Sequence, residues 1–280
     1  MQKPIEMVTS RQNPLVSLTV KLADRKHRER EGLFRFDGKK LFLEALAAGI
    51  PLYAVLLRES NKEAFLNAAA DYALSDDCRF VILPDDLFDR VSEENSPEGV
   101  IALARTLTHL HRTLDAAAWA REAPASGASR VLFLESVRDP GNLGTIIRSA
   151  RAFGADLLVL SADCADIYNP RVLRAAMGTV FGQPIIRTPD LAAVIGAYAK
   201  TGRVFAATLD EGAVTLGNLP FRAGDAVIVG NEGHGLSPAV IAAATGSIFI
   251  PMAAGVESLN AGVAASVLLW ELCRDTGGAR

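Results

Sequence analysis

Apolar and polar positions along the first third of the chain alternate in the pattern of short strands and amphipathic helices. Apolar runs predict strands, and the amphipathic segments between them predict helices. The predicted strands lie at residues 33–38, 52–60, 80–84 and 96–105, and the predicted helices at 39–49, 61–74 and 85–92. Strands and helices that alternate at this length indicate a layered α/β domain, which we place at residues 1–108.

A second alternating pattern begins at residue 130, and its strands are almost continuously apolar. The predicted strands lie at residues 131–135, 156–161, 203–209, 226–230 and 247–252, and the predicted helices at 145–154, 170–178, 191–200, 238–245 and 258–274. Such strands fit a parallel sheet covered on both faces. We therefore expect a second α/β domain at 130–280. Residues 109–129 form the predicted linker, with a helix over 109–121 and small residues at 122–129.

Composition narrows the class of protein. Half of the residues are hydrophobic and 22% are charged, which excludes a disordered chain and allows a sizeable core. The longest apolar runs fall short of the ~20 residues that span a bilayer, and the amino terminus lacks a secretory signal pattern. Three cysteines without close spacing indicate reduced thiols in a cytoplasmic protein. The sequence contains no cluster of His and Cys that would suggest a metal site.

The charge distribution is uneven, although the net charge is only −3. Residues 1–40 carry ten Lys and Arg against five Asp and Glu, and residues 41–120 carry six against thirteen. Five of the ten basic residues lie in the segment KLADRKHRER at 21–30. A basic block near a terminus is typical of a phosphate-contacting surface. A solvated helix face, with Asp24 and Glu29 as local partners, is the alternative.

Three loops follow the predicted strands of the second domain, where parallel sheets carry their functional groups. They are DPGNLG at 139–144, GNEGHGLS at 230–237 and PMAAGVESLN at 251–260. We expect the first to be a tight turn shaped by its glycines. A dinucleotide fingerprint counted from Gly141 would need glycines where Leu143 and Ile146 stand, and no Walker motif is present. Asp163, just after the second strand, still leaves a dinucleotide-dependent oxidoreductase as an alternative.

The second loop also contains His234 and Ser237, which invite a hydrolase interpretation. Their spacing is not that of a catalytic triad, and no GxSxG motif occurs. We therefore interpret His234 as a surface loop residue.

Taken together, the three segments DPGNLGTIIRSARAFGA, IVGNEGHGLS and IPMAAGVESLNAGVAASVLLWE resemble the SpoU/TrmH family of RNA ribose 2′-O-methyltransferases, within the SPOUT superfamily. NPRVLRAAMGTVF at 169–181 resembles a weaker family segment, with Ala176 in place of a frequent serine. Residues 1–108 look like the accessory, ribosomal-protein-like domain that binds RNA in members acting on ribosomal RNA. The resemblance implies an α/β SPOUT domain with a trefoil knot, S-adenosyl-L-methionine as cofactor, no metal, and a homodimer that shares its active site.

The resemblance also assigns roles to individual residues. The catalytic positions are Arg148, Asn142, Glu232, Ser258 and Asn260. The positions implied to contact the cofactor are Gly230, Ile250, Leu259, Met252 and Thr208. Arg148 would bind the target phosphate and 2′-oxygen, whereas a helix arginine that faces solvent is the alternative. The apolar positions Val263, Val267, Leu268 and Leu269 of the last helix would supply the dimer face, or else simply pack in the core.

The expected substrate is RNA, with 23S-type ribosomal RNA favoured over transfer RNA because of the accessory domain. The basic residues expected to contact its phosphates are Arg11, Lys21, Arg25, Lys26, Arg28 and Arg30, joined by Arg35, Lys39 and Lys40. A catalytically silent RNA-binding protein on the same scaffold is a further alternative, which the intact motif residues oppose.

Overall fold

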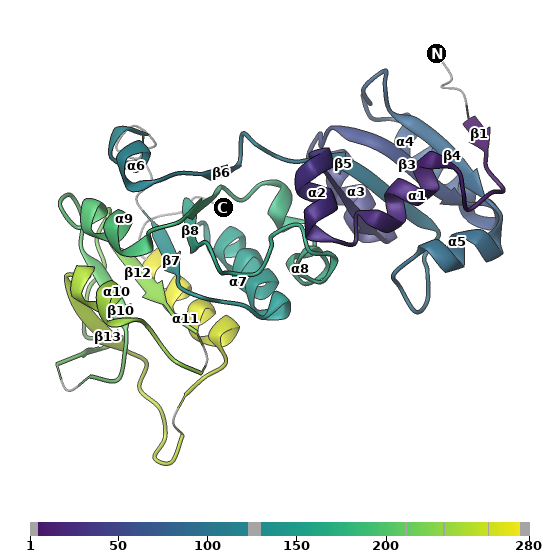
Figure 1. Cartoon of the computed structure of the whole chain (residues 1–280). Helices are drawn as coiled ribbons and strands as arrows, with labels where there is room; N and C mark the ends of the chain where they lie inside the picture. The colour runs from purple at the N-terminus through teal and green to yellow at the C-terminus, as the bar shows by residue number, and fades with distance from the viewer. Residues whose placement is uncertain (1–4, 123–129, 211, 232, 257, 275–280) are drawn as a thin grey trace. The chain divides into compact units, whose positions relative to one another are not determined.

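The computed structural model describes residues 5–122, 130–210, 212–231, 233–256 and 258–274. The chain forms two compact units (Figure 1). One unit comprises the chain up to Leu107 together with Asp166–Phe181, and the other comprises Thr108–Ala165 and the chain from Gly182 onward. This division differs from the predicted domains in two places. Residues 109–122 belong to the second unit, and a segment from the middle of the predicted second domain belongs to the first.

The first unit contains a five-stranded mixed sheet in the order β1-β4-β3-β5-β2. Strands β1, β4 and β3 run parallel, and β5 is antiparallel to both β3 and β2. The strands are β1 (Ile5–Met7), β2 (Leu33–Asp37), β3 (Leu52–Arg58), β4 (Arg79–Leu83) and β5 (Val100–Arg105). The predicted strands are thus present, and the short edge strand β1 was not predicted.

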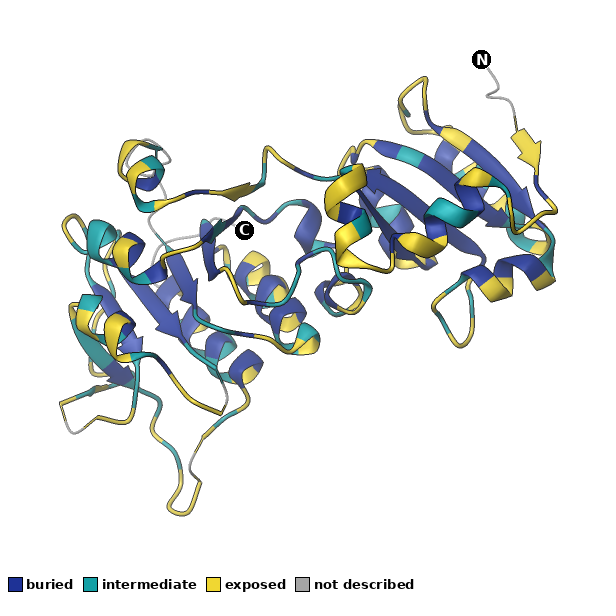
Figure 2. Ribbon diagram, viewed as in Figure 1, coloured by how far each residue is buried: buried dark blue, intermediate teal, exposed yellow. Residues whose placement is uncertain are grey.

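Helices cover this sheet, and buried apolar side chains fill the space between them (Figure 2). Side chains of α1 and α5 form one core cluster with alternate residues of β3, β4 and β5. On α3 and α4, Phe42 and Phe65 pack edge to face at 5.9 Å. The helices are α1 (Pro14–Lys21), α2 (Arg25–Glu31), α3 (Lys39–Ala47), α4 (Lys62–Ala70) and α5 (Asp85–Val91), with a 3-10 turn η1 (Glu59–Asn61).

Residues 166–181 complete the first unit beside its edge strand β2. They contain α8 (Pro170–Ala176) and the 3-10 turn η3 (Thr179–Phe181). The ring of Tyr168 stacks on Phe34 with centroids 4.5 Å apart, and Phe181 lies 5.4 Å from Phe36. The Tyr168 hydroxyl accepts a hydrogen bond from the backbone N–H of Leu107 at 2.7 Å. Aromatic contacts of this kind add to the free energy gained by apolar burial, so the segment is an integral part of this core.

Two arginines expected to contact RNA are structural, and for them the prediction is wrong. Arg28 is 3% exposed, donates two hydrogen bonds to Asp166 Oδ2 at 3.0 and 2.6 Å, and also bonds backbone carbonyls. Arg35 is 1% exposed and forms a bidentate pair with Asp37. A buried guanidinium needs such partners because an unpaired buried charge costs several kcal/mol. Neither side chain is available to a phosphate.

The second unit contains an eight-stranded sheet in the order β11-β13-β10-β12-β7-β8-β9-β6. All strand pairs of this sheet among the described residues are parallel, as the continuous apolar runs predicted. The strands are β6 (His111–Thr113), β7 (Val131–Leu134), β8 (Leu157–Ser161), β9 (Ile185–Thr188), β10 (Val204–Ala207), β11 (Val214–Thr215), β12 (Ala226–Val229) and β13 (Gly246–Phe249). Strands β6, β9 and β11 were not predicted.

Helices cover both faces of this sheet (Figure 1). Helices α6, α9 and α10 share a core cluster with β7, β8, β10 and β12 on one face. Helices α7 and α11 pack against each other, and α11 also contacts β12. The helices are α6 (Ala116–Glu122), α7 (Pro140–Phe153), α9 (Leu191–Tyr198), α10 (Pro238–Ala243) and α11 (Ala261–Cys273). None of the described helices combines the length and apolar character needed to cross a membrane.

Two local predictions in this unit are wrong. The segment DPGNLG is not a loop turn, because α7 begins at Pro140 with Asp139 as its N-cap, whose carboxylate accepts the Asn142 N–H at 2.8 Å. Proline at the first helical position needs no hydrogen-bond partner for its nitrogen, which favours this start. The predicted helix over 109–121 is shorter, since His111–Thr113 pair with β9 and the helix begins at Ala116.

The Arg28–Asp166 pair gives a first testable prediction. Replacing Arg28 with Ala leaves the partly buried Asp166 carboxylate without its cation, so the free energy of unfolding should fall by about 3 kcal/mol. The exposed Arg25, three residues earlier on the same helix, is the matched control, and its replacement should cost under about 0.5 kcal/mol. Urea unfolding of both variants measures the difference. Equal stability of the two variants would contradict the structural role of Arg28.

Candidate active site

The segments that follow four strands of the second unit lie at the carboxyl edge of the parallel sheet, around the junction of β7 and β12. At this junction the strand order reverses, because the chain leaves β7 toward β8 while β12 and β10 lie on its other side. Open parallel sheets bind ligands at such a point, since the loops of neighbouring strands diverge and leave a crevice. The residues that follow β7, β10, β12 and β13 therefore define the candidate site.

A cavity of about 430 Å³ lies between the loops that follow β10, β12 and β13 and the start of α11. All five residues expected to contact a cofactor line it: Thr208, Gly230, Ile250, Met252 and Leu259. Ser258, one of the expected catalytic residues, also lines it. Most of the remaining lining residues are apolar, as in sites that hold a small organic molecule.

Two details of the lining bear on what the cavity can hold and how it is formed. The Thr208 hydroxyl oxygen is buried and bonds no other described residue, so it is free to bond a bound molecule. At Gly230 a Cβ atom would lie 2.6 Å from the Gly235 carbonyl oxygen, so the two backbone segments of the loop can approach only with glycine there.

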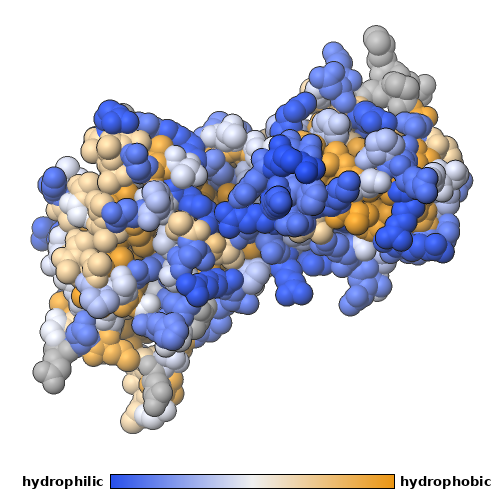
Figure 3. All heavy atoms as spheres, in the orientation of Figure 1, coloured by the Kyte–Doolittle hydropathy of each residue, from blue (hydrophilic) through white to orange (hydrophobic). Residues whose placement is uncertain are grey.

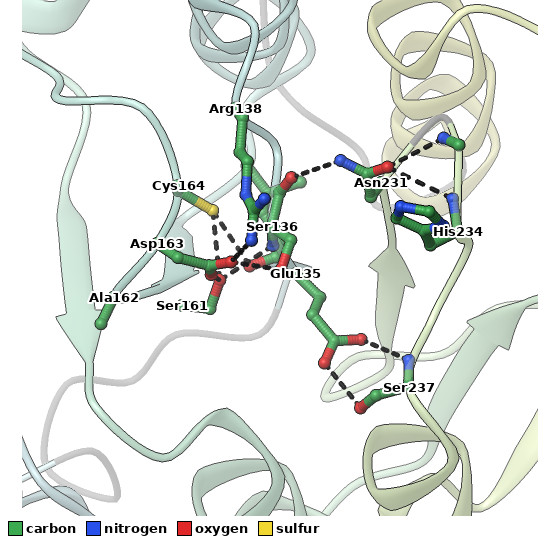
Figure 4. A network of polar contacts seen from close by, with 12 residues as sticks. Glu135, Ser136, Arg138, Ser161, Ala162, Asp163, Cys164, Asn231, His234 and Ser237 are labelled. Atoms are coloured by element: carbon green, nitrogen blue, oxygen red, sulfur yellow. Dashed lines mark hydrogen bonds and ion pairs between the residues drawn. The ribbon is translucent and has the colours of Figure 1, made fainter.

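The loop after β12 is folded on itself by the Asn231 side chain. Its Oδ1 accepts the backbone N–H of Gly233 at 2.8 Å and that of His234 at 3.3 Å. The backbones of Asn231 and Gly235 form a bridge with two hydrogen bonds. The Asn231 Nδ2 donates to the Ser136 carbonyl at 2.9 Å, which ties this loop to the end of β7 (Figure 4).

Glu135, the residue after β7, makes a second connection to the same loop. Its two carboxylate oxygens accept the Ser237 hydroxyl at 2.6 Å and the Ser237 N–H at 2.8 Å (Figure 4). Ser237 is also the N-cap of α10. Charge-assisted hydrogen bonds of this length are strong. Glu135 therefore fixes both the end of the loop that lines the cavity and the start of α10.

Ser136 connects β7 to β8 and has an unusual backbone. Its φ of 54° is in the left-handed region, which costs a non-glycine residue about 1 kcal/mol. Its N–H donates to Ser161 Oγ at 2.9 Å, and its hydroxyl donates to Asp163 Oδ2 at 2.7 Å. Together with the Asn231 bond to its carbonyl, these contacts hold the residue in that conformation.

The Asp163 carboxylate is the centre of this second network (Figure 4). It accepts hydrogen bonds from Ser136, from Ser161 Oγ at 2.6 Å and from Arg138 Nη2 at 2.8 Å. Desolvation alone would raise its pKa, but these hydrogen bonds outweigh that effect and lower the pKa to about 2. The Asp163 carboxylate thus serves to hold Arg138, and its oxygens are already engaged and not available to bind the ribose of a dinucleotide.

The starts of α7 and α11 are joined by two residues expected to be catalytic. Asn260 Nδ2 donates to Asn142 Oδ1 at 2.8 Å. The Asn260 Oδ1 at the same time caps α11 by accepting the N–H groups of Gly262 and Val263. The two helices approach each other closely at this point. A Cβ atom added to Gly262 would lie only 3.3 Å from Thr145 Cβ. Farther along, Ser149 and Ser266 bond across the same helix pair at 2.7 Å.

The other expected catalytic residues are placed differently. Arg148 is exposed on α7, forms no hydrogen bond or ion pair with another described residue, and does not line the cavity. Glu232 lies outside the described residues. The structure thus joins Asn142 to Asn260 and places Ser258 at the cavity, while Arg148 stands apart from it.

Sequence reasoning missed Glu135, Ser136, Arg138 and Asn231. One signal was available for Glu135, since a carboxylate that ends the apolar run VLFLE comes at the edge where functional loops meet. The partners of these residues lie up to 102 positions away along the chain, which no local pattern reveals.

Comparison with known proteins decides the family. Residues 129–270 match the model of the SpoU rRNA methylase family, and residues 13–102 match the MRM3-like substrate binding domain. The chain belongs to the SpoU rRNA methylase family. This membership overturns the dinucleotide-dependent oxidoreductase as an alternative, in agreement with the engaged carboxylate of Asp163.

Relatives of this SpoU family member resemble it over nearly its whole length. The 23S rRNA (guanosine(2553)-2′-O)-methyltransferase RlmP of Bacillus subtilis is 30% identical over 96% of this chain and 99% of its own. A tRNA/rRNA methyltransferase of Synechocystis, slr1673, itself uncharacterized, is 32% identical over 98% of this chain and 96% of its own. The crystal structure of an AdoMet-bound rRNA methyltransferase from Sinorhizobium meliloti is 27% identical, with a TM-score of 0.78 over 96% of this chain and 98% of that one.

The clamp between Glu135 and Ser237 gives a second prediction. Glu135→Ala removes two hydrogen bonds that hold the cavity loop, and should weaken binding of S-adenosyl-L-methionine by up to about 30-fold, because the two bonds together contribute about 2 kcal/mol. Glu135→Gln should have an intermediate effect, since its amide keeps one acceptor oxygen. Titration calorimetry measures both affinities. An unchanged dissociation constant in Glu135→Ala would show that the clamp does not shape the cavity.

Proposed function

We propose that this chain is an RNA methyltransferase that moves a methyl group from S-adenosyl-L-methionine to a ribose 2′-hydroxyl. The observation that carries the proposal is the convergence of Thr208, Gly230, Ile250, Met252 and Leu259 on one cavity. Ribosomal RNA is the favoured substrate over transfer RNA. This preference for ribosomal RNA is supported by the match of residues 13–102 to the substrate binding domain and by the whole-length similarity to the 23S rRNA enzyme RlmP.

The cavity suits the cofactor by its size and lining. Apolar side chains and the Gly230 backbone would enclose the adenosine, and the buried Thr208 hydroxyl offers a hydrogen bond. When bound, S-adenosyl-L-methionine supplies an electrophilic methyl group on a sulfonium. The chain's own residues then have to bring the 2′-oxygen within ~3–3.5 Å of that methyl group and align the two.

Arg148 has the central role in our proposal. Arginine is a poor general base in proteins, so we assign Arg148 to binding the target phosphate and 2′-oxygen and not to removing the hydroxyl proton. A cation beside the hydroxyl stabilises the developing negative charge and lowers the pKa of the hydroxyl. Asn142, Asn260 and Ser258 orient the target ribose, and we retain Glu232 in the same role.

We further propose that two copies of the chain form one homodimer and share each active site. Arg148 does not line its own cavity, which favours a position in the site of the partner copy. The outer face of α11 carries Val263 and Trp270, which are 48% and 55% exposed, and Val267 lies between them. Leu268 and Leu269 are buried in their own unit and are unavailable for the interface, which corrects the predicted dimer face. We also propose that the loops after β12 and β13, together with α11, form a trefoil knot.

Seven basic residues remain for the RNA surface, and all are exposed: Arg11, Lys21, Arg25, Lys26, Arg30, Lys39 and Lys40. The face over α2 is hydrophilic (Figure 3). Arg25 and Arg30 have acidic neighbours, Glu29 and Glu31, on the same helix. Exposed pairs of this kind contribute little stability and exchange readily for phosphate contacts.

The free, buried thiols of Cys78, Cys164 and Cys273 support a cytoplasmic location.

The decisive test uses Arg148. Arg148→Ala should lower methyl transfer to ribosomal RNA by at least ~100-fold, because it removes a cation aimed at the reacting oxygen. Affinity for S-adenosyl-L-methionine and the melting temperature should stay as in the parent. The matched control is Arg151→Ala, which removes the next exposed arginine of α7 and should keep nearly full activity.

Radiolabelled methyl transfer to unmethylated ribosomal and transfer RNA, followed by mapping of the product, provides the measurement. A target with 2′-deoxyribose should stay unmodified. No incorporation into either RNA by the parent protein would overturn the proposed function, and methylation of the deoxy target would point to base methylation.

Subunit mixing tests the shared site. Arg148→Ala and Gly230→Val should each be inactive alone, since a side chain at position 230 would clash with the Gly235 backbone and distort the cofactor cavity. In a refolded equimolar mixture half of the dimers are mixed, and one of their two sites is intact, so activity should recover to roughly a quarter of the parent level in an isologous dimer. A mixture as inactive as its components would contradict active sites built from two copies.

A further inference from the structure

A second cavity of about 300 Å³ lies next to the cofactor cavity at the carboxyl edge of the sheet. The two cavities share the wall formed by Asn231, His234, Gly235 and Leu236. The second one is otherwise lined by Glu135, Ser136, Arg138, Ser237 and Pro238 (Figure 4). Whereas the first cavity is mostly apolar, the second is surrounded by polar and charged side chains.

Arg138 is the cation of this second cavity. Its side chain is 68% exposed, yet Asp163 holds it in place through a 2.8 Å hydrogen bond from Nη2. Ser136 and Ser161 in turn fix the Asp163 carboxylate. A guanidinium has five N–H donors, and Arg138 spends one on Asp163 without bonding any other described acceptor. The remaining donors are therefore available to a ligand.

The other polar groups of the second cavity are compatible with the binding of an anion. The His234 ring has no hydrogen-bond partner among the described residues, although its backbone N–H is bound by Asn231. Among the described residues of the wall the one carboxylate is Glu135, and both of its oxygens point to Ser237 and accept hydrogen bonds there. Its charge is therefore partly compensated on the side away from Arg138 (Figure 4).

We propose that the second cavity binds a backbone phosphate of the RNA strand that flanks the methylated nucleotide, with Arg138 as its principal ligand and His234 as an additional donor. This inference rests on the proposed function. A planar guanidinium pairs with phosphate through two parallel N–H bonds, which fix orientation as well as position. A phosphate held beside the cofactor cavity sets which ribose of the strand reaches the methyl group, since phosphate contacts determine register.

An RNA phosphate is a better occupant than the carboxylate of the cofactor. The first cavity is already in the usual size range of small-molecule sites and contains all five expected cofactor contacts. Arg138 also directly precedes the N-cap of α7, the helix that carries Arg148. Because Arg148 is proposed to act in the site of the partner copy, Arg138 is the arginine that the chain places beside its own cofactor cavity.

Steady-state kinetics of the full chain test the proposal. Arg138→Ala should raise the KM for RNA about tenfold, because one charge-assisted contact is lost. The kcat at saturating RNA should stay within about twofold, since the contact exists before and during transfer. The dependence of log affinity for RNA on log salt concentration should become shallower by about 0.7 for one lost phosphate contact on a single strand.

Three further variants make the result specific. Arg138→Lys keeps the charge but loses the planar fork, so it should preserve the salt dependence and recover only part of the affinity. His234→Ala should raise the KM for RNA about threefold, as expected for one neutral hydrogen bond. Arg222→Ala is the matched control, because Arg222 is exposed in the same unit and lines neither cavity. It should leave every parameter unchanged.

The outcomes separate this inference from the proposed function. If the parent methylates RNA and Arg138→Ala retains the parent KM and salt dependence, the phosphate site is overturned and the methyltransferase stands. If Arg138→Ala instead weakens binding of S-adenosyl-L-methionine alone, Arg138 binds the cofactor carboxylate and the inference is likewise wrong. If the parent methylates no RNA, it is the proposed function that fails.

Discussion

The candidate site depends on the hydrogen bonds that the two residues after β7 make to the loop after β12. Glu135 accepts both polar hydrogens of Ser237, and the Ser136 carbonyl accepts the Asn231 side chain. A glycine-rich loop has high conformational entropy, and without such partners it would sample many shapes. Because the sheet holds β7 rigidly, these bonds transmit its geometry to the cavity wall. The left-handed backbone of Ser136 is the conformational cost of placing its groups correctly.

The same edge of the sheet separates two chemical environments within a short distance. On one side of the loop the lining is apolar and suits an adenosine, and on the other it is polar with a fixed cation. A methyltransferase that acts on a polymer needs both, since its donor is a small molecule and its acceptor is one nucleotide of a charged strand. One loop that forms the common wall brings the two reactants together without a separate hinge.

Much of the fold could be predicted from the sequence, because parallel strands buried on both faces are continuously apolar, as in β7 and β12. Strand β9 was missed since it is short, follows Pro184 and contains Arg187, whose guanidinium bonds backbone carbonyls of the loop that follows β8. The start of α7 was misjudged because glycines suggested a turn, although Asp139 followed by Pro140 is a helix-start pattern. The five residues that the family resemblance assigned to the cofactor line one cavity, and their contact with the cofactor stays a prediction. Arg28 shows the limit, because its partner Asp166 is 138 positions away and charge patterning alone cannot tell a buried arginine from a surface one.

The placement of residues 166–181 in the first unit has a consequence for the modularity of the protein. This segment lies in sequence between β8 and β9 of the second unit, inside the stretch that matches the methylase family model. Its buried side chains, among them Val172, Leu173 and Phe181, complete the core of the first unit. A gene fragment that encodes only the methylase stretch would therefore carry a solvent-exposed apolar helix and be prone to aggregate. The two units are interwoven along the chain, so recombination cannot exchange one of them without its share of the other.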